Sequence, residues 1–219
     1  MSRIIIVDDH PLFRTALRQT LTGQGQASAV EEAGDLSART DALEADRDCD
    51  LVLLDLNMPG AHGFSGLLLL RAQYPDIPVM IISATEDPKV IRRTFELGAA
   101  GYLPKSVGPA EIRTAIDTVL KGGVSVPAGV DLRTEDEETA FSRRLATLTP
   151  QQIRVLMMLS DGLMNKQIAY ELSISEATVK AHVSSILQKL DVDSRTQAVI
   201  AASRIEQGQF ETLLSRNPI

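Results

Sequence analysis

The sequence of 219 residues predicts an α/β domain with a doubly wound parallel sheet, followed by a smaller all-α domain. The first prediction rests on short apolar runs that alternate with helical patterns in the first half of the chain. The second rests on the purely helical periodicity that begins at Leu148. Glycines, prolines and acidic residues between these parts indicate a linker with a short helix near residues 137–145. We therefore expect domains at 1–123 and 148–204, a linker at 124–147 and a tail at 205–219.

The elements of the first domain follow from apolar runs and helix caps. Strands buried on both faces read as continuous apolar runs, which are clear at 4–7, 51–54, 79–82 and 101–103 and weaker at 29–32. Helices are expected at 11–21, 36–45, 63–74, 87–97 and 109–120. Pro11 suits a first helical turn, where no amide donor is needed, and Gly98 suits a left-handed helix cap.

Polar residues follow the strands where each one ends. Asp8 and Asp9 follow the first strand, Asp55 the third, Ser83 the fourth, and Lys105 comes after the fifth. The carboxyl ends of parallel strands share one edge of a sheet, where open α/β folds place their ligands. Three carboxylates at one site repel each other unless a cation lies among them, and a site with few oxygen ligands suits Mg²⁺.

The chemistry expected at this edge is phosphoryl transfer, which depends on positioning and charge neutralisation. Asp55 is the predicted nucleophile, which becomes an acyl phosphate. Asp8, Asp9 and Asp55 would hold Mg²⁺ together with the backbone carbonyl of Asn57. The phosphoryl oxygens would pair with Ser83 and Lys105.

These residues, in this order and spacing, resemble the response-regulator receiver domain, and residues 8–14 (Asp-Asp-His-Pro-Leu-Phe-Arg) resemble its NarL/FixJ branch. The resemblance covers residues 1–123 and implies a flavodoxin-like (βα)5 fold with strand order 2-1-3-4-5. It also implies that Tyr102 acts as an aromatic switch whose rotamer follows phosphorylation through Ser83. Half-buried packing is the simpler role for Tyr102.

The second domain has the pattern of a helix-turn-helix. Thr149 and Gln152 form a capping-box start, a short helix follows at 165–172, and Ser175 caps the next one. The third helix has an apolar stripe, and its opposite side carries groups that suit phosphates and groove edges. This opposite side comprises Lys180, Ala181, Ser184, Ser185 and Gln188.

Residues 165–169 (Asn-Lys-Gln-Ile-Ala) and 178–183 (Thr-Val-Lys-Ala-His-Val) resemble the LuxR-type helix-turn-helix, a four-helix DNA-binding domain. The resemblance implies that Lys180, Ala181 and Ser184 read the groove, with Gln188 on the same face. It places Lys166, Thr178 and Lys189 near the phosphate backbone. A last helix at 194–204 carries apolar residues that suit a two-fold contact, so an active homodimer is expected.

Charge, cysteine content and hydropathy indicate which binding partners and which cellular location suit the chain. The net charge of −7 arises entirely before residue 147, which does not suit a general binder of polyanions. The single cysteine, Cys49, excludes an intrachain disulfide or a cysteine metal cluster, and a cytoplasmic location fits it. The apolar runs are too short to span a bilayer, and the start does not resemble a signal peptide.

The leading hypothesis is a bacterial two-component response regulator and transcription factor, with a sensor histidine kinase and promoter DNA as partners. It would not be an enzyme beyond self-phosphotransfer and autodephosphorylation. A phosphatase or phosphotransferase with an aspartyl intermediate is the alternative, but Asn57 stands where such enzymes carry a second aspartate. A receiver used only for protein interaction is a third hypothesis. The unphosphorylated receiver could either mask the recognition helix or fail to dimerise.

Overall fold

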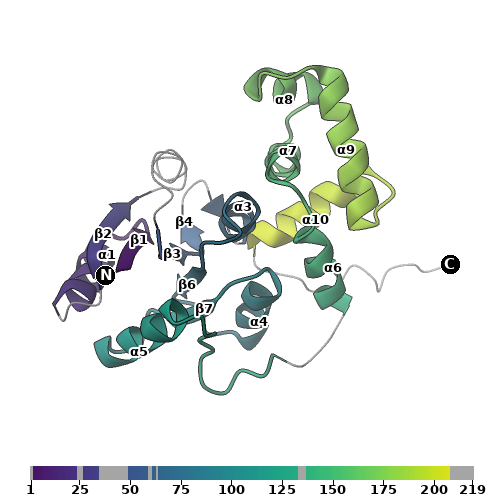
Figure 1. The fold of residues 1–219 in the computed structure, drawn as a ribbon. Coiled ribbons are helices and arrows are strands. Elements are labelled where there is room, and N and C mark those ends of the chain that lie inside the picture. Colours follow the sequence, from purple (N-terminus) through teal and green to yellow (C-terminus); the bar gives the residue numbers. More distant parts are fainter. Residues whose placement is uncertain are drawn as a thin grey trace.

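The structure is a computed structural model that describes residues 2–23, 27–34, 49–58, 61–62, 64–132 and 137–207. Figure 1 shows two parts, a sheet flanked by helices and a group of helices that follows it in the chain. This division matches the predicted order of an α/β domain followed by an all-α domain. Among the described residues, no helix is both long enough and apolar enough to cross a membrane.

The central sheet has five parallel strands in the order β2-β1-β3-β6-β7. In chain order these are β1 (Ser2–Val7), β2 (Ala27–Ala33), β3 (Leu51–Asp55), β6 (Val79–Ser83) and β7 (Gly101–Pro104). When the five strands of this sheet are numbered 1 to 5 along the chain, their order is 2-1-3-4-5, and the prediction is therefore confirmed. The register aligns the carboxyl ends, because Val7 pairs with Leu54, Asp55 with Ile82 and Ser83 with Pro104.

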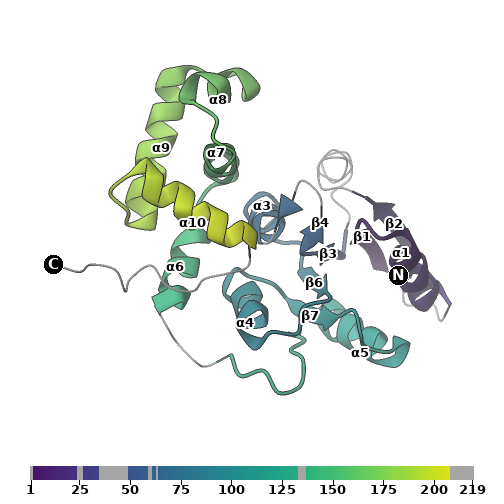
Figure 2. The same cartoon turned by 180° about the vertical axis from the view of Figure 1, so that it is seen from behind.

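Helices cover both faces of the sheet, as Figures 1 and 2 show. One face carries α1 (Pro11–Thr22) and α5 (Pro109–Leu120), and the other carries α3 (Ser65–Gln73) and α4 (Pro88–Glu96). Alternate strand residues point to the two faces, so Ile4 and Ile6 pack toward α1 and α5 while Ile5 and Val7 join the opposite core. The helix predicted at 36–45 lies outside the described residues.

A glycine cap follows α4, and a small hairpin follows β3. Gly98 follows α4 with φ of 93°, which confirms the predicted left-handed cap. Directly after Asp55, β4 (Asn57–Met58) pairs antiparallel with β5 (Ala61–His62), and this small hairpin was not predicted. The helix expected from residue 63 accordingly begins at Ser65.

The helical part contains α6 (Glu137–Leu145), α7 (Pro150–Ser160), α8 (Asn165–Glu171), α9 (Glu176–Leu190) and α10 (Arg195–Gln207). The predicted capping box of α7 is present, since Thr149 and Gln152 exchange hydrogen bonds between side chain and backbone. Ser175 caps α9 by accepting from the amide of Thr178 at 3.1 Å. Apolar side chains of α7, α8, α9 and α10 share one core.

The segment after α5 runs along the edge of the sheet before it reaches α6. The amide of Tyr102 donates to the carbonyl of Ser125 at 3.0 Å, and the amide of Ser125 donates to the carbonyl of Ala100 at 3.1 Å. Strand β7 is the outer strand of the sheet, so its free backbone groups are available for this pairing. The predicted linker thus begins with residues that are bound to the first domain.

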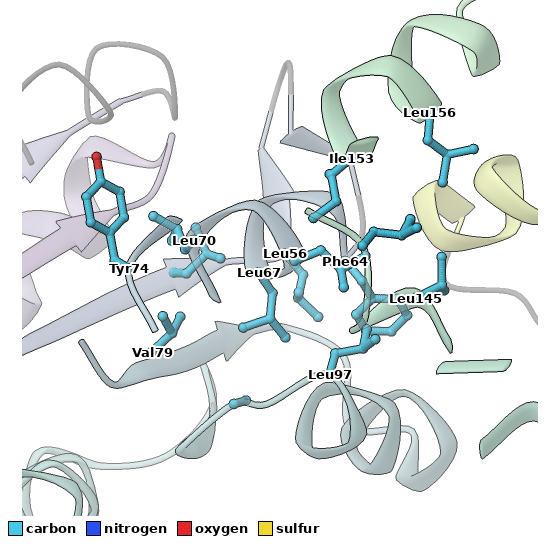
Figure 3. Packing of buried hydrophobic residues seen from close by; sticks show 14 of the residues in the cluster. Leu56, Phe64, Leu67, Leu70, Tyr74, Val79, Leu97, Leu145, Ile153 and Leu156 are labelled. Carbon is cyan, nitrogen blue, oxygen red and sulfur yellow. The ribbon is translucent and has the colours of Figure 1, made fainter. Parts of the chain in front are cut away.

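The two parts share an apolar contact. Helix α3 packs on α7, and α4 packs on α6. Figure 3 shows Phe64 and Leu97 of the first part beside Leu145 and Ile153 of the second. The four leucines at 67–70 give α3 apolar residues all round, as expected for a helix covered on two sides. One hydrophobic cluster therefore continues from the sheet into the helical part.

A buried arginine accompanies this contact. The side chain of Arg93 on α4 is 4% exposed, forms an ion pair with Glu96 at 2.8 Å and donates a hydrogen bond to the hydroxyl of Ser142 on α6. Ser142 is itself fully buried. A buried cation requires such partners, because leaving it without them costs several kcal/mol. The pairing of α4 with α6 thus depends on a specific polar contact as well as on apolar packing.

Candidate functional site

The carboxyl ends of β1, β3 and β7 bring two carboxylates and an ammonium together. Asp8 and Asp55 are 1% and 2% exposed. Nζ of Lys105 lies 2.7 Å from Oδ2 of Asp55 and 2.8 Å from Oδ2 of Asp8. The structure thus places Asp8, Asp55 and Lys105 in direct contact, as the strand-end pattern predicts.

Backbone amides hold the two buried carboxylates in place. The amide of His10 donates to Oδ1 of Asp8 at 2.7 Å, and the amide of Asn57 donates to Oδ1 of Asp55 at 3.1 Å. Each carboxylate therefore offers Oδ2 to Lys105 while Oδ1 is fixed by the turn that follows it. Arg14 adds a hydrogen bond from its guanidinium to the carbonyl of Asp8.

The carboxylates also form a group that suits a hard cation. Ligand atoms of Asp8, Asp9, Asp55 and His10 all lie within 4.8 Å of one another. Oδ1 of Asp9 lies 2.6 Å from Nδ1 of His10, is buried, and accepts no hydrogen bond from the described residues. A cation among these oxygens would satisfy it, and carboxylate oxygens are the ligands that Mg²⁺ prefers. Sequence reasoning did not place His10 in this group, although it directly follows Asp9.

Lys105 keeps its charge in this setting. Burial opposes the charge of its ammonium, but the hydrogen bonds that the ammonium donates to Asp55 and Asp8, together with their negative charges, outweigh that effect, so the pKa of Lys105 is raised. The site therefore contains a permanent cation between two carboxylates.

Ser83 and Tyr102 lie on neighbouring strands beside this group. Ser83 is fully buried, its hydroxyl accepts from the amide of Thr85 at 3.2 Å, and its carbonyl accepts from the amide of Lys105 at 2.7 Å. The Tyr102 hydroxyl donates to the carbonyl of Thr85 at 2.7 Å, and the ring is 1% exposed. The side chain of Tyr102 is thus buried and bonded to the segment that begins with Ser83.

The phenol of Tyr102 should make folding stability pH-dependent in the alkaline range. Burial is the main cause that raises the pKa of Tyr102 from 10.0 to about 12. A hydrogen bond with Ser83 lowers the pKa, and the negative charges of Asp55, Glu86 and Asp87 raise it. The folded state then holds this proton more tightly than the unfolded state, so stability is present below pH ~10 and declines as pH rises toward ~12. The total effect is roughly 2–3 kcal/mol.

Urea unfolding across this pH range measures the effect. Tyr102→Phe should lose the steep alkaline decline, whereas Tyr170→Phe should retain it, because the ring of Tyr170 is 83% exposed. Parallel pH profiles for the wild type and Tyr102→Phe would refute the assignment to Tyr102.

The predicted reading face of α9 is open to solvent in the full chain. Lys180, Ala181, Ser184 and Gln188 are all exposed. Lys180 makes one ion pair, at 3.2 Å to Glu176 on the preceding turn. On the flanking positions, Lys166 and Thr178 are exposed as well. The first domain therefore does not cover this face.

Two residues of α9 form hydrogen bonds with the start of α7 or the residues just before it. Ser185, expected on the outer face, is half-buried and accepts from Nε2 of Gln152 at 2.8 Å. Lys189, expected near phosphates, donates to Oε1 of Gln152 at 2.9 Å and to the carbonyl of Thr147 at 2.8 Å. Both residues lie where α9 crosses the start of α7, so their polar groups form hydrogen bonds within the domain.

Two family models match the chain. The model described as the response regulator receiver domain matches residues 4–117. The model described as bacterial regulatory proteins of the luxR family matches residues 146–202. The matched ranges coincide with the sheet part and with helices α7 to α10.

Curated relatives match over nearly the whole length. The chain is 42% identical to the glycerol metabolism activator of Pseudomonas putida, covering 94% of this chain and 97% of that protein. It is 38% identical to the nitrate/nitrite response regulator protein NarP of Escherichia coli, covering 90% and 93%.

Solved structures share the fold. RcsB from Salmonella enterica bound to a promoter has a TM-score of 0.56 at 23% identity, covering 93% of this chain and 98% of that one. A LuxR family DNA-binding response regulator from Silicibacter pomeroyi has a TM-score of 0.52 at 34% identity, covering 58% and 98%.

Proposed function

Because the chain belongs to the response regulators that join a receiver domain to a LuxR-type DNA-binding domain, we propose that phosphorylation of Asp55 controls its dimerisation and promoter binding. The observation that carries this proposal is the contact of Lys105 with Asp55 and Asp8 at the carboxyl edge of the sheet. A buried carboxylate beside a fixed cation is suited to accept and then hold a transferred phosphoryl group. The donor would be the phosphohistidine of a sensor histidine kinase, in the cytoplasm.

Each residue of the site has a distinct part in the transfer. An oxygen of Asp55 attacks phosphorus, a new P–O bond forms, and the bond from phosphorus to the donor breaks with its electron pair leaving on the donor. Asp8, Asp9, Asp55 and the backbone carbonyl of Asn57 would hold Mg²⁺, which supplies charge neutralisation when bound. Lys105 then pairs with a phosphoryl oxygen in place of the Asp55 carboxylate.

The signal would leave the site through Ser83 and Tyr102. A phosphoryl oxygen on Asp55 offers a new acceptor to the Ser83 hydroxyl. A shift of Ser83 toward it would move the Thr85 segment, to which the Tyr102 hydroxyl is bonded. The buried ring of Tyr102 would follow this segment, so its rotamer would report the state of Asp55.

DNA recognition is assigned to the exposed face of α9. Lys180, Ala181, Ser184 and Gln188 would enter the major groove, and Lys166 and Thr178 would contact phosphates. Lys189 instead stabilises the domain, since its ammonium is bonded to α7 and to the preceding loop. One neutral module should bind DNA weakly, and two modules on adjacent half-sites gain affinity through avidity. RcsB dimers have been seen on DNA, in a structure that this fold resembles.

Control by assembly is favoured over masking of α9. The face of α9 is already exposed, whereas α7 and α10 contact the receiver domain through α3 and β5. We propose that the unphosphorylated chain keeps α10 against the receiver domain and that phosphorylation releases it for a two-fold contact. Ile200, which is 37% exposed on α10, is available for that contact.

The test uses the full chain with Mg²⁺ and acetyl phosphate. Intact mass reports the phosphoryl group, sedimentation reports the oligomeric state, and titration with duplex DNA reports affinity. The expected result is one added phosphoryl group accompanied by dimer formation and tighter DNA binding. A phosphorylated protein whose oligomeric state and DNA affinity are unchanged would overturn the proposal.

A further inference from the structure

The ammonium of Lys105 lies over an aromatic ring as well as between two carboxylates. Its Nζ is 4.9 Å from the centroid of the Phe13 ring, within the range of a cation–π contact. Phe13 is the third residue of α1, is half-buried, and packs against the core between the sheet and α5. The ring is therefore held by the fold, and Lys105 contacts a fixed surface.

We infer that Phe13 is a positioning residue for Lys105 during phosphoryl transfer. The inference rests on the proposed function of the site. Before transfer, the N–H groups of the ammonium point to the carboxylates of Asp55 and Asp8. As Asp55 becomes an acyl phosphate, Lys105 must exchange the carboxylate of Asp55 for a phosphoryl oxygen.

An aromatic face suits this exchange. It attracts the cation through its quadrupole in any orientation of the N–H donors, and it does not offer a competing anionic acceptor. The attraction therefore persists while the hydrogen bonds of Lys105 change. The ring also occupies one side of the ammonium, where water would otherwise compete with the phosphoryl group. Phe13 would act through Lys105 and takes no part in making or breaking bonds, so its role is indirect.

The first experiment compares phosphorylation rates of the full chain with acetyl phosphate and Mg²⁺. Phe13→Leu keeps an apolar side chain but removes the aromatic face, and it should slow the reaction about threefold to tenfold. Phe13→Trp, which presents the strongest aromatic face, should retain the wild-type rate. Equal rates for the wild type and Phe13→Leu would overturn the inference, as would equal losses in the leucine and tryptophan variants.

A double-mutant cycle separates positioning from packing. In a Lys105→Ala background, Phe13→Leu should have no further effect on the residual rate, because the cation that the ring positions is gone. A packing defect would slow both backgrounds by the same factor, and that outcome would also overturn the inference.

A second variant covers the case in which Phe13→Leu fails to fold. Incorporation of 3,4,5-trifluorophenylalanine at position 13 keeps the ring shape and withdraws electron density from its face. A slower reaction is again expected, and an unchanged rate would refute the role of Phe13. If the wild type itself gains no phosphoryl group, the proposed function fails too; a phosphorylated wild type with insensitive variants refutes only the role of Phe13.

Discussion

Asp55→Asn is expected to abolish phosphoryl acceptance and, with it, any phosphate-dependent gain in DNA affinity. The asparagine has nearly the same shape and keeps one of the two oxygens that accept from the backbone amide of Asn57 and from Lys105, so the site should remain folded. Its neutral amide, however, cannot act as the nucleophile that the carboxylate provides. Intact mass after incubation with Mg²⁺ and acetyl phosphate should show one added phosphoryl group in the wild type and none in the variant.

Asp76→Asn is the matched control for this change. Asp76 is an exposed carboxylate that precedes β6, at the opposite edge of the sheet from Asp55. This variant should accept a phosphoryl group like the wild type. A phosphoryl group found on Asp55→Asn would show that another residue, with Asp8 and Asp9 nearest, accepts it instead.

Lys180→Ala should reduce the affinity for a specific DNA site by about tenfold or more, since one good contact to a base edge contributes roughly 1–3 kcal/mol. Its folding stability should change little, because the side chain is exposed and its ion pair with Glu176 is of the weak i,i+4 kind. The measurement is titration of a duplex that the phosphorylated wild type selects from a random pool. Repeating the titration at several salt concentrations separates a base contact from a phosphate contact, because loss of a phosphate contact lowers the salt slope by about one.

Lys189→Ala provides the contrast on the same helix. Its ammonium is bonded to the carbonyl of Thr147 and to Gln152, so its loss should destabilise the domain by about 1–3 kcal/mol. Chemical unfolding of the full chain measures this cost. A stable Lys189→Ala variant with strongly reduced DNA affinity would instead place Lys189 on the DNA.

The apolar runs of the sequence determined the strands of the main sheet and the residues at their ends, whereas the order of the strands came from the family resemblance. A strand buried on both faces reads as a continuous apolar run, and its last residue is then known to emerge at the carboxyl edge. Asp8, Asp55, Ser83 and Lys105 could therefore be assigned to one site before their distances were known. The capping box at Thr149 was equally local, because its hydrogen bonds join residues three apart.

The tertiary structure decided which polar groups on one arc of a helix are free. Ser184 and Ser185 are adjacent in α9 and both belong to its polar side, yet one is exposed and the other is bonded to Gln152. Helical periodicity gives the direction of each side chain around its own axis. It contains no information on where a second helix crosses, and α7 crosses at Ser185 and Lys189.

The same reason applies to the contacts between distant segments. Phe13 lies in the helix expected at 11–21 and Arg93 in the helix expected at 87–97, and the sequence indicated a partner for neither. Only the tertiary structure, which places Phe13 of α1 4.9 Å from Lys105 and packs α4 on α6, brings them to Lys105 and Ser142. A local pattern fixes which face of an element is apolar, because the direction of each side chain around its element depends on the period of that element alone. The partner that meets each face depends on the path of the whole chain, so the structure was needed to find it.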